Sequence, residues 1–243
     1  MATRRSRPDE QEYDLLQQSA IRKAIGDRTL QSVAEKPSFW MTAQVDCTAL
    51  VLVRGEMKQA APEVLPTYND FIIKAVAAIL RDNPRFNAWR AEDGLHVLRH
   101  VNVGFAVATE QGVMLPTVLD ADEKSLTEVA TETKGMVEMA RKGRLRASLQ
   151  MGAGFTVSNI GPGDVDTFSA IISPPQTGIL SFGAMKPRPV VEGDQVAIRQ
   201  TMNCTLSIDH AAADGADGAK LLSDVKAKLE DESFLRSLAA DQA

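Results

Sequence analysis

The chain has 243 residues, of which 44% are hydrophobic and 24% charged, so it is large enough and apolar enough to bury a sizeable core. Its formal net charge of −5 at pH 7 argues against nucleic-acid binding, which needs a basic face. The sequence has neither a run of about 18 apolar residues nor a secretory signal, so we expect no membrane span and a cytoplasmic protein. Its two cysteines, Cys47 and Cys204, have no CxxC partner, which argues against a metal site.

Helix-periodic and alternating apolar segments follow one another along the chain without a repeat or a linker. We therefore predict a single domain over 16–243, preceded by a flexible polar arm over 1–15. Helices are expected over 16–33, 71–81, 125–142 and 216–230. Strands are expected over 39–47, 95–98, 101–109, 112–119, 155–159, 178–183 and 196–206.

Two of the predicted helices begin with the spacing of a capping box, Thr67 with Asp70 and Ser125 with Glu128. The first of them is apolar nearly all round and should be buried. The C-terminal segment 231–243 is polar apart from Phe234, Leu235 and Leu238, and its end, 237–243, should bury little. Because strands and helices mix without a strict β–α–β alternation, we predict the α/β class, a mixed sheet with helices packed on it. No GxGxxG or Walker loop points to a dinucleotide or ATP.

The turn after the last predicted strand holds two titratable residues that could take part in catalysis. His210 follows the last predicted strand, and Asp214 comes four positions later, before Gly215. A histidine titrates near neutral pH and can act as a general base, which typically contributes about 10²–10⁴-fold to rate. Asp214 either orients the imidazole as in a catalytic triad or has a structural role that shapes the turn. Four residues across a turn rarely aim a carboxylate at the ring, so we favour the structural role.

The base needs a proton to remove. The chain has no GxSxG elbow and no cysteine near a turn, so we expect the attacking thiol or hydroxyl to arrive on a ligand. Acyl transfer onto that atom passes through a tetrahedral oxyanion, which needs a hydrogen-bond donor. Ser158, at the end of a strand before a glycine-rich turn, is our candidate.

Several segments together resemble the catalytic domain of the dihydrolipoamide acyltransferases, the core component of 2-oxoacid dehydrogenase complexes. The segments that carry the resemblance are 21–25, 67–75, 84–88, 101–109, 155–159, 174–176, 207–210 and 213–216.

The resemblance implies a two-layer α/β sandwich like that of chloramphenicol acetyltransferase, in a homotrimer whose active sites lie between subunits. It implies that His210 deprotonates the thiol of coenzyme A and that Ser158 of the neighbouring subunit donates to the oxyanion. Asp214 is then expected to pair with Arg22, and both Arg22 and Gly215 to support the site. The lipoyl group comes from another domain or chain, the dehydrogenase components are possible partners, and no metal takes part.

The chain departs from the family pattern after the histidine, where Ala211–Ala213 replace an arginine and two bulky aliphatic residues, so we expect looser packing. We expect no lipoyl or peripheral-subunit-binding domain, and the polar end of the chain predicts that assembly stops at a trimer. Three functions stay open: transfer between dihydrolipoamide and coenzyme A, transfer from acyl-coenzyme A to a small-molecule acceptor, and a non-catalytic core or scaffold.

Overall fold

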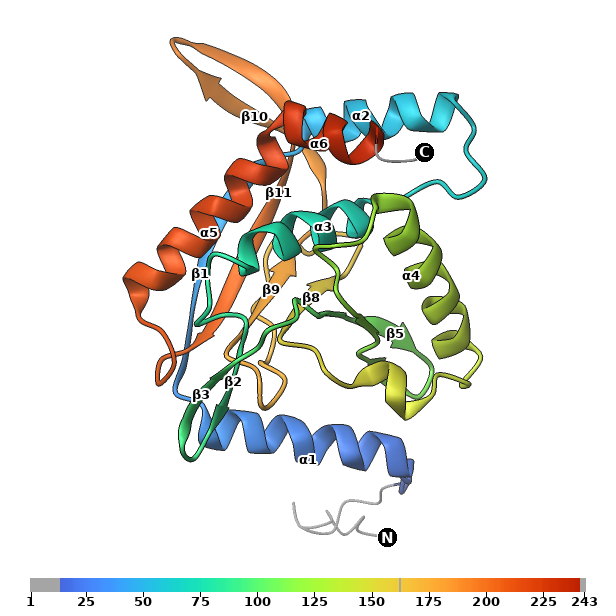
Figure 1. Ribbon diagram of the computed structural model, residues 1–243, viewed down its shortest axis with the longest axis vertical. Helices are drawn as coiled ribbons and strands as arrows, with labels where there is room; N and C mark the ends of the chain where they lie inside the picture. Colours follow the sequence, from blue (N-terminus) through green and yellow to red (C-terminus); the bar gives the residue numbers. More distant parts are fainter. Residues whose placement is uncertain (1–13, 162, 241–243) are drawn as a thin grey trace, which may run out of the picture.

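The computed structural model describes residues 14–161 and 163–240, and the arm expected over 1–15 lies almost wholly outside them (Figure 1). The helices are α1 Ala20–Glu35, α2 Thr48–Gln59, α3 Tyr68–Leu80, α4 Leu126–Arg141, α5 Gly215–Glu230 and α6 Glu232–Ala240, with a 3-10 turn over Ala147–Gln150. The strands are β1 Ser38–Asp46, β2 Ala88–Ala91, β3 Gly94–Val97, β4 Val103–Phe105, β5 Val107–Thr109, β6 Gly112–Met114, β7 Thr117–Val118, β8 Phe155–Asn159, β9 Gly178–Phe182, β10 Lys186–Glu192 and β11 Gln195–Asp209.

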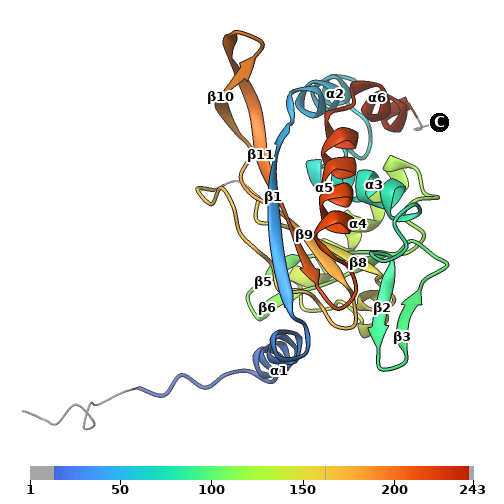
Figure 2. The same ribbon diagram turned by 90° about the vertical axis from the view of Figure 1, so that its left-hand side faces the viewer.

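The main sheet has the strand order β1-β11-β9-β8-β4-β7, and β10 pairs with β11 off this path. Its pairs are mixed, since β8 runs parallel to both β4 and β9 whereas β11 runs antiparallel to β1 and β9. Helices α3 and α5 cover one face, and α1 lies apart from them at the base of the molecule (Figure 2). The predicted mixed sheet with packed helices is confirmed.

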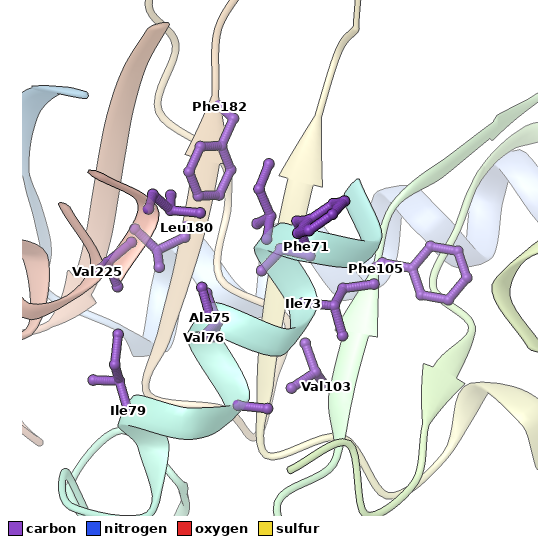
Figure 3. Close-up of a cluster of buried hydrophobic side chains, with 14 of the residues drawn as sticks. Phe71, Ile73, Ala75, Val76, Ile79, Val103, Phe105, Leu180, Phe182 and Val225 are labelled. Atoms are coloured by element: carbon purple, nitrogen blue, oxygen red, sulfur yellow. The ribbon is translucent and has the colours of Figure 1, made fainter. Parts of the chain in front are cut away.

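Helix α3 is the centre of the core. Its predicted capping box is present, because the amides of Asp70 and Thr67 donate to each other's side chains, and a helix of this composition has no polar face to leave in water. Its side chains meet those of β4, β9 and α5 (Figure 3). The labelled cluster is Phe71, Ile73, Ala75, Val76, Ile79, Val103, Phe105, Leu180, Phe182 and Val225, all buried. Truncating a large member to alanine would cost about 2–5 kcal/mol.

The prediction of one continuous strand over 101–109 is wrong. That segment divides into β4, which stays in the main sheet, and β5, which pairs with β6 in a separate two-stranded sheet. Its partner segment divides at Pro116, whose carbonyl accepts from the Phe105 amide at 2.9 Å. A proline has no N–H to donate to a ladder, so the hairpin breaks there and turns out of the sheet.

The end of the chain, 237–243, is described as far as residue 240, and the expectation that it buries little is wrong for Leu238, which is only 9% exposed. These described residues belong to α6, which packs on α2 and also buries Leu235 completely. Arg236 adds a bidentate pair with Glu56 of α2, at 2.7 and 3.1 Å. Half-exposed charges of this kind contribute little stability, so the buried leucines hold the helix in place.

Apolar side chains remain exposed on a hairpin that projects beyond the helices, formed by β10 and the first half of β11 (Figures 1 and 2). Val191, Val196 and Ile198 on this hairpin are 78%, 71% and 72% exposed, and Trp40 on β1 is 62% exposed. Exposed apolar groups gathered on one element are typical of an interface.

Candidate active site

His210 is the first residue after β11 and is exposed. Its amide donates to the Pro37 carbonyl at 3.0 Å, which ties the turn to the segment between α1 and β1. Its ring lies beside that of Phe39, with centroids 4.8 Å apart and planes at 46°. The backbone is therefore held while the imidazole stays open to a reactant. Of the three alanines expected to pack loosely, Ala211 is exposed, whereas Ala212 and Ala213 are buried.

Asp214 is the N-cap residue of α5. One of its carboxylate oxygens accepts from the amides of Asp217 and Ala216, at 3.1 and 2.9 Å. These two hydrogen bonds, with the nearby charges of Arg85 and His210, hold the pKa of Asp214 below its usual range. Among the described residues no hydrogen bond joins its carboxylate to the imidazole. The structural alternative that the sequence left open for Asp214 is therefore the one the geometry supports.

The expected ion pair between Asp214 and Arg22 does not form within the chain's described part. Arg22 lies in the first turn of α1, about 20 Å along the helix axis from Lys36 at the other end. The turn that carries His210 and Asp214 is attached at that other end, beside Pro37. Gly215 begins α5 without a positive φ, and a Cβ there would meet nothing within 4 Å, so the local backbone does not require a glycine.

Ser158 and His210 lie far apart within one chain. Ser158, on β8, lies opposite Ser181 of β9, which lies opposite Thr205 of β11. From Thr205 to His210 the chain runs about 17 Å along the strand, and two strand spacings add about 10 Å across the sheet, which places the two Cα atoms about 19 Å apart. A side chain cannot bridge that distance.

A charged cluster that was not predicted from the sequence surrounds the buried carboxylate of Asp209, the residue before His210. The carboxylate of Asp209 is fully buried and contacts Lys36 Nζ at 2.9 Å and Arg90 Nε at 2.5 Å. One local feature of the sequence could have pointed to Asp209. It is an acidic residue at the end of an alternating strand, directly before His210. Its two partners are distant in sequence and carry no local pattern.

A cavity of about 700 Å³ lies under α1, and neither His210 nor Ser158 lines it. It is bordered by residues of α1, by Trp89, and by the segment 173–176.

The two thiols are poor nucleophiles. Burial raises the pKa of Cys47 to about 12 and also raises the pKa of Cys204 well above its usual range, so both thiols stay protonated at neutral pH. Over the described residues, no cluster of three or more metal-binding side chains occurs. Likewise, none of the helices described there is long and apolar enough to cross a membrane.

Comparison with known proteins places these features in context. The model of the family "2-oxoacid dehydrogenases acyltransferase (catalytic domain)" matches residues 10–236. The dihydrolipoyllysine-residue acetyltransferase component of the pyruvate dehydrogenase complex of Rickettsia bellii is 34% identical over 228 residues, which cover 93% of this chain and 54% of that protein. The chain thus spans about half the length of the curated relatives it matches.

Two solved structures are similar. One, of Azotobacter vinelandii dihydrolipoamide acetyltransferase, is 27% identical, with a TM-score of 0.88 over 96% of each chain. It belongs to work on the role of a serine, a histidine and an asparagine in catalysis; the histidine follows the serine by 52 positions and the asparagine comes four later. The other, a chloramphenicol acetyltransferase, is 14% identical, with a TM-score of 0.54 over 84% of this chain and 94% of that one. It shares the fold, which confirms the predicted architecture.

Proposed function

The chain belongs to the 2-oxoacid dehydrogenase acyltransferase family, as its resemblance predicted, and we propose that it transfers an acyl group between dihydrolipoamide and coenzyme A. The observation that carries the proposal is a shared spacing. In this chain His210 follows Ser158 by 52 positions and Asp214 follows four later, which are the separations of the serine, histidine and asparagine studied in the Azotobacter enzyme. Asp214 stands where that protein has the asparagine.

The proposed chemistry begins with proton transfer. His210 takes the proton from the thiol of coenzyme A, and the thiolate attacks the carbonyl carbon of the acylated dihydrolipoamide. The carbonyl oxygen becomes an oxyanion, and the Ser158 hydroxyl donates a hydrogen bond to it; removing such a donor typically costs about 3–4 kcal/mol of transition-state stabilisation. The intermediate then collapses. The carbon–sulfur bond to the lipoyl sulfur breaks, and that sulfur receives the proton from His210.

The site we propose is shared between copies of the chain. His210 and Ser158 are too far apart to act on one carbonyl within a chain, so the serine that serves each histidine comes from a neighbouring copy in a homotrimer. The exposed apolar side chains of the β10–β11 hairpin and of β1 supply surface for such contacts. Two buried, unbridged thiols agree with assembly in the reducing cytoplasm.

The reaction can be tested with free substrates. We expect the purified chain to transfer acetyl from acetyl-coenzyme A to free dihydrolipoamide, because the similar proteins are acetyltransferases. Faster transfer to small hydroxyl or amine acceptors would favour the small-molecule function instead. If the chain shows no turnover and does not bind coenzyme A in a calorimetric titration, a non-catalytic scaffold is the function that remains.

Two variants of Asp214 distinguish its role as the N-cap of α5 from any role of its negative charge. Asparagine is as good an N-cap as aspartate, so Asp214→Asn should keep turnover within about twofold and keep the thermal midpoint. Asp214→Ala should lower both, because two amides of α5 lose their acceptor. The pair is measured by initial rates and thermal unfolding at pH 7.

The same variants have a pH signature. Because the folded pKa of Asp214 is lowered, its contribution to stability is present above the ordinary pKa of about 3.9 and is lost as the pH falls through the lowered value. Asp214→Asn should lack this loss of stability at acid pH. Equal acid sensitivity in the two proteins would contradict the capping role.

A further inference from the structure

We propose that the buried side chains of Asp209 and Lys36, together with the partly exposed side chain of Arg90, form a charged clamp that positions His210 and tunes the charge of its imidazole. These three residues would then affect the rate of a reaction that they do not touch. The inference rests on the proposed role of His210 as the base. The three are positioning residues, because they act on the reaction only through His210.

The clamp is built around one carboxylate. Oδ2 of Asp209 receives both Lys36 Nζ, at 2.9 Å, and Arg90 Nε, at 2.5 Å. Its other oxygen, Oδ1, accepts from the amide of Ala211 at 3.1 Å. The backbone of His210 is therefore fixed on both sides. Asp209 before it is held in the core by Lys36 and Arg90, and Ala211 after it donates to the Asp209 carboxylate. Movement of the Asp209 side chain would carry the imidazole with it.

The clamp joins three separate elements. Lys36 is the C-cap residue of α1, and Arg90 on β2 also donates from Nη2 to the Glu35 carbonyl at 2.7 Å. The amide of Asp209 donates to the Thr177 carbonyl at 2.9 Å, just before β9. The turn that carries the histidine is therefore fixed to α1, β2 and the edge of β9 through one residue.

Burial makes the charges of the clamp effective. The side chains of Asp209 and Lys36 are 0% and 3% exposed, so water screens their fields little. One carboxylate faces two cations, and burying such groups is costly unless each is paired. A pair that served stability alone would need one cation. With the second cation, the three residues of the clamp together carry a formal charge of +1.

Other charged groups also face the turn, and they enter the balance. They are Arg85 from the loop after α3, which lies 3.7 Å from Asp217 and donates to the Ala212 carbonyl, and Asp214 and Asp217 from α5. With the three residues of the clamp, these six groups sum to zero formal charge. Removing one anion or one cation from the clamp therefore moves the local charge in opposite directions.

The test compares two clamp variants by the pH dependence of kcat/KM in acetyl transfer to free dihydrolipoamide. Asp209→Asn should lower kcat by about 10²-fold, since a misplacement of about 1 Å has that effect. It should also move the rising limb of the profile to lower pH by about half a pH unit, because two unpaired cations disfavour the imidazolium. Lys36→Met removes one cation and should move the same limb to higher pH by a similar amount.

The clamp predicts that the rising limb of the kcat/KM profile moves to lower pH in Asp209→Asn and to higher pH in Lys36→Met. Loss of packing alone cannot move the two limbs in opposite directions. Asp70→Asn is the matched control: Asp70 is equally buried but caps α3, so this variant should lose stability with an unchanged pH profile. Limbs that stay in place, or that move in the same direction, would overturn the clamp. If Asp209→Asn does not fold, Lys36→Met still decides. Full activity in His210→Ala would refute the assigned base rather than the clamp.

Discussion

Replacing His210 with alanine should lower turnover by about 10²-fold or more while the fold and the assembly stay intact. The rate falls because no other group of the turn can take the thiol proton at neutral pH. Stability should hold because the side chain is exposed and packs only beside the Phe39 ring among the ring contacts of the described residues. Initial rates of acetyl transfer to dihydrolipoamide, with thermal unfolding and sedimentation, measure both parts.

The chain supplies matched controls for this variant. Its other two histidines, His96 and His100, are also exposed, and each contacts an aspartate, Asp93 at 2.7 Å and Asp120 at 2.6 Å. Replacing either with alanine should keep turnover within about twofold, since neither lies on the catalytic turn. A loss of activity as large in His96→Ala as in His210→Ala would remove His210 from the role of base.

The second large effect concerns the proposed active site that takes His210 from one subunit and Ser158 from another. Ser158→Ala alone should be strongly impaired, since removing an oxyanion donor typically costs about 10²–10³-fold in kcat. When Ser158→Ala and His210→Ala chains are produced together and assemble at random, however, activity should return. At equal amounts, about one quarter of the interfaces of a cyclic trimer bring an intact histidine to an intact serine.

A second mixture calibrates the first. Wild-type chains mixed with chains that carry both substitutions should retain about one quarter of the wild-type rate if each site spans two subunits, and about one half if each site lies within one chain. A mixture of the two single variants that stays inactive, beside a calibration near one half, would contradict the shared site.

Local features of the fold were predictable from the sequence, because their causes lie within a few residues. The capping boxes at Thr67 and Ser125 are both present, and α3 and α4 begin directly after these two residues. Helix α3 therefore begins at Tyr68, three residues before the predicted start at 71. Helix α6 was missed because its three apolar residues give too little pattern by themselves. Its stability comes from α2, to which the chain returns about 180 residues later.

In the candidate site, too, the residues with local sequence signals were predictable and those whose partners are distant in sequence were not. His210 and Asp214 stand out because a histidine at a strand exit and an acidic residue before a helix are local signals. The partners of Asp209 are not local, since Lys36 lies 173 positions away and meets it only when β1 pairs with β11. The pairing of Asp214 with Arg22 was wrong because the sequence does not show which end of α1 faces the turn.

The position of Ser158 on β8, far from the turn that follows β11, has a consequence for a newly made chain. If the oxyanion donor and the base meet only across an interface, a folded but unassembled subunit can neither consume acyl-coenzyme A nor hydrolyse it by accident. Specific activity then depends on protein concentration, and dilution below the dissociation constant of the trimer switches the chemistry off without unfolding the chain. Under the proposed shared site, assembly would be the step that activates the chain.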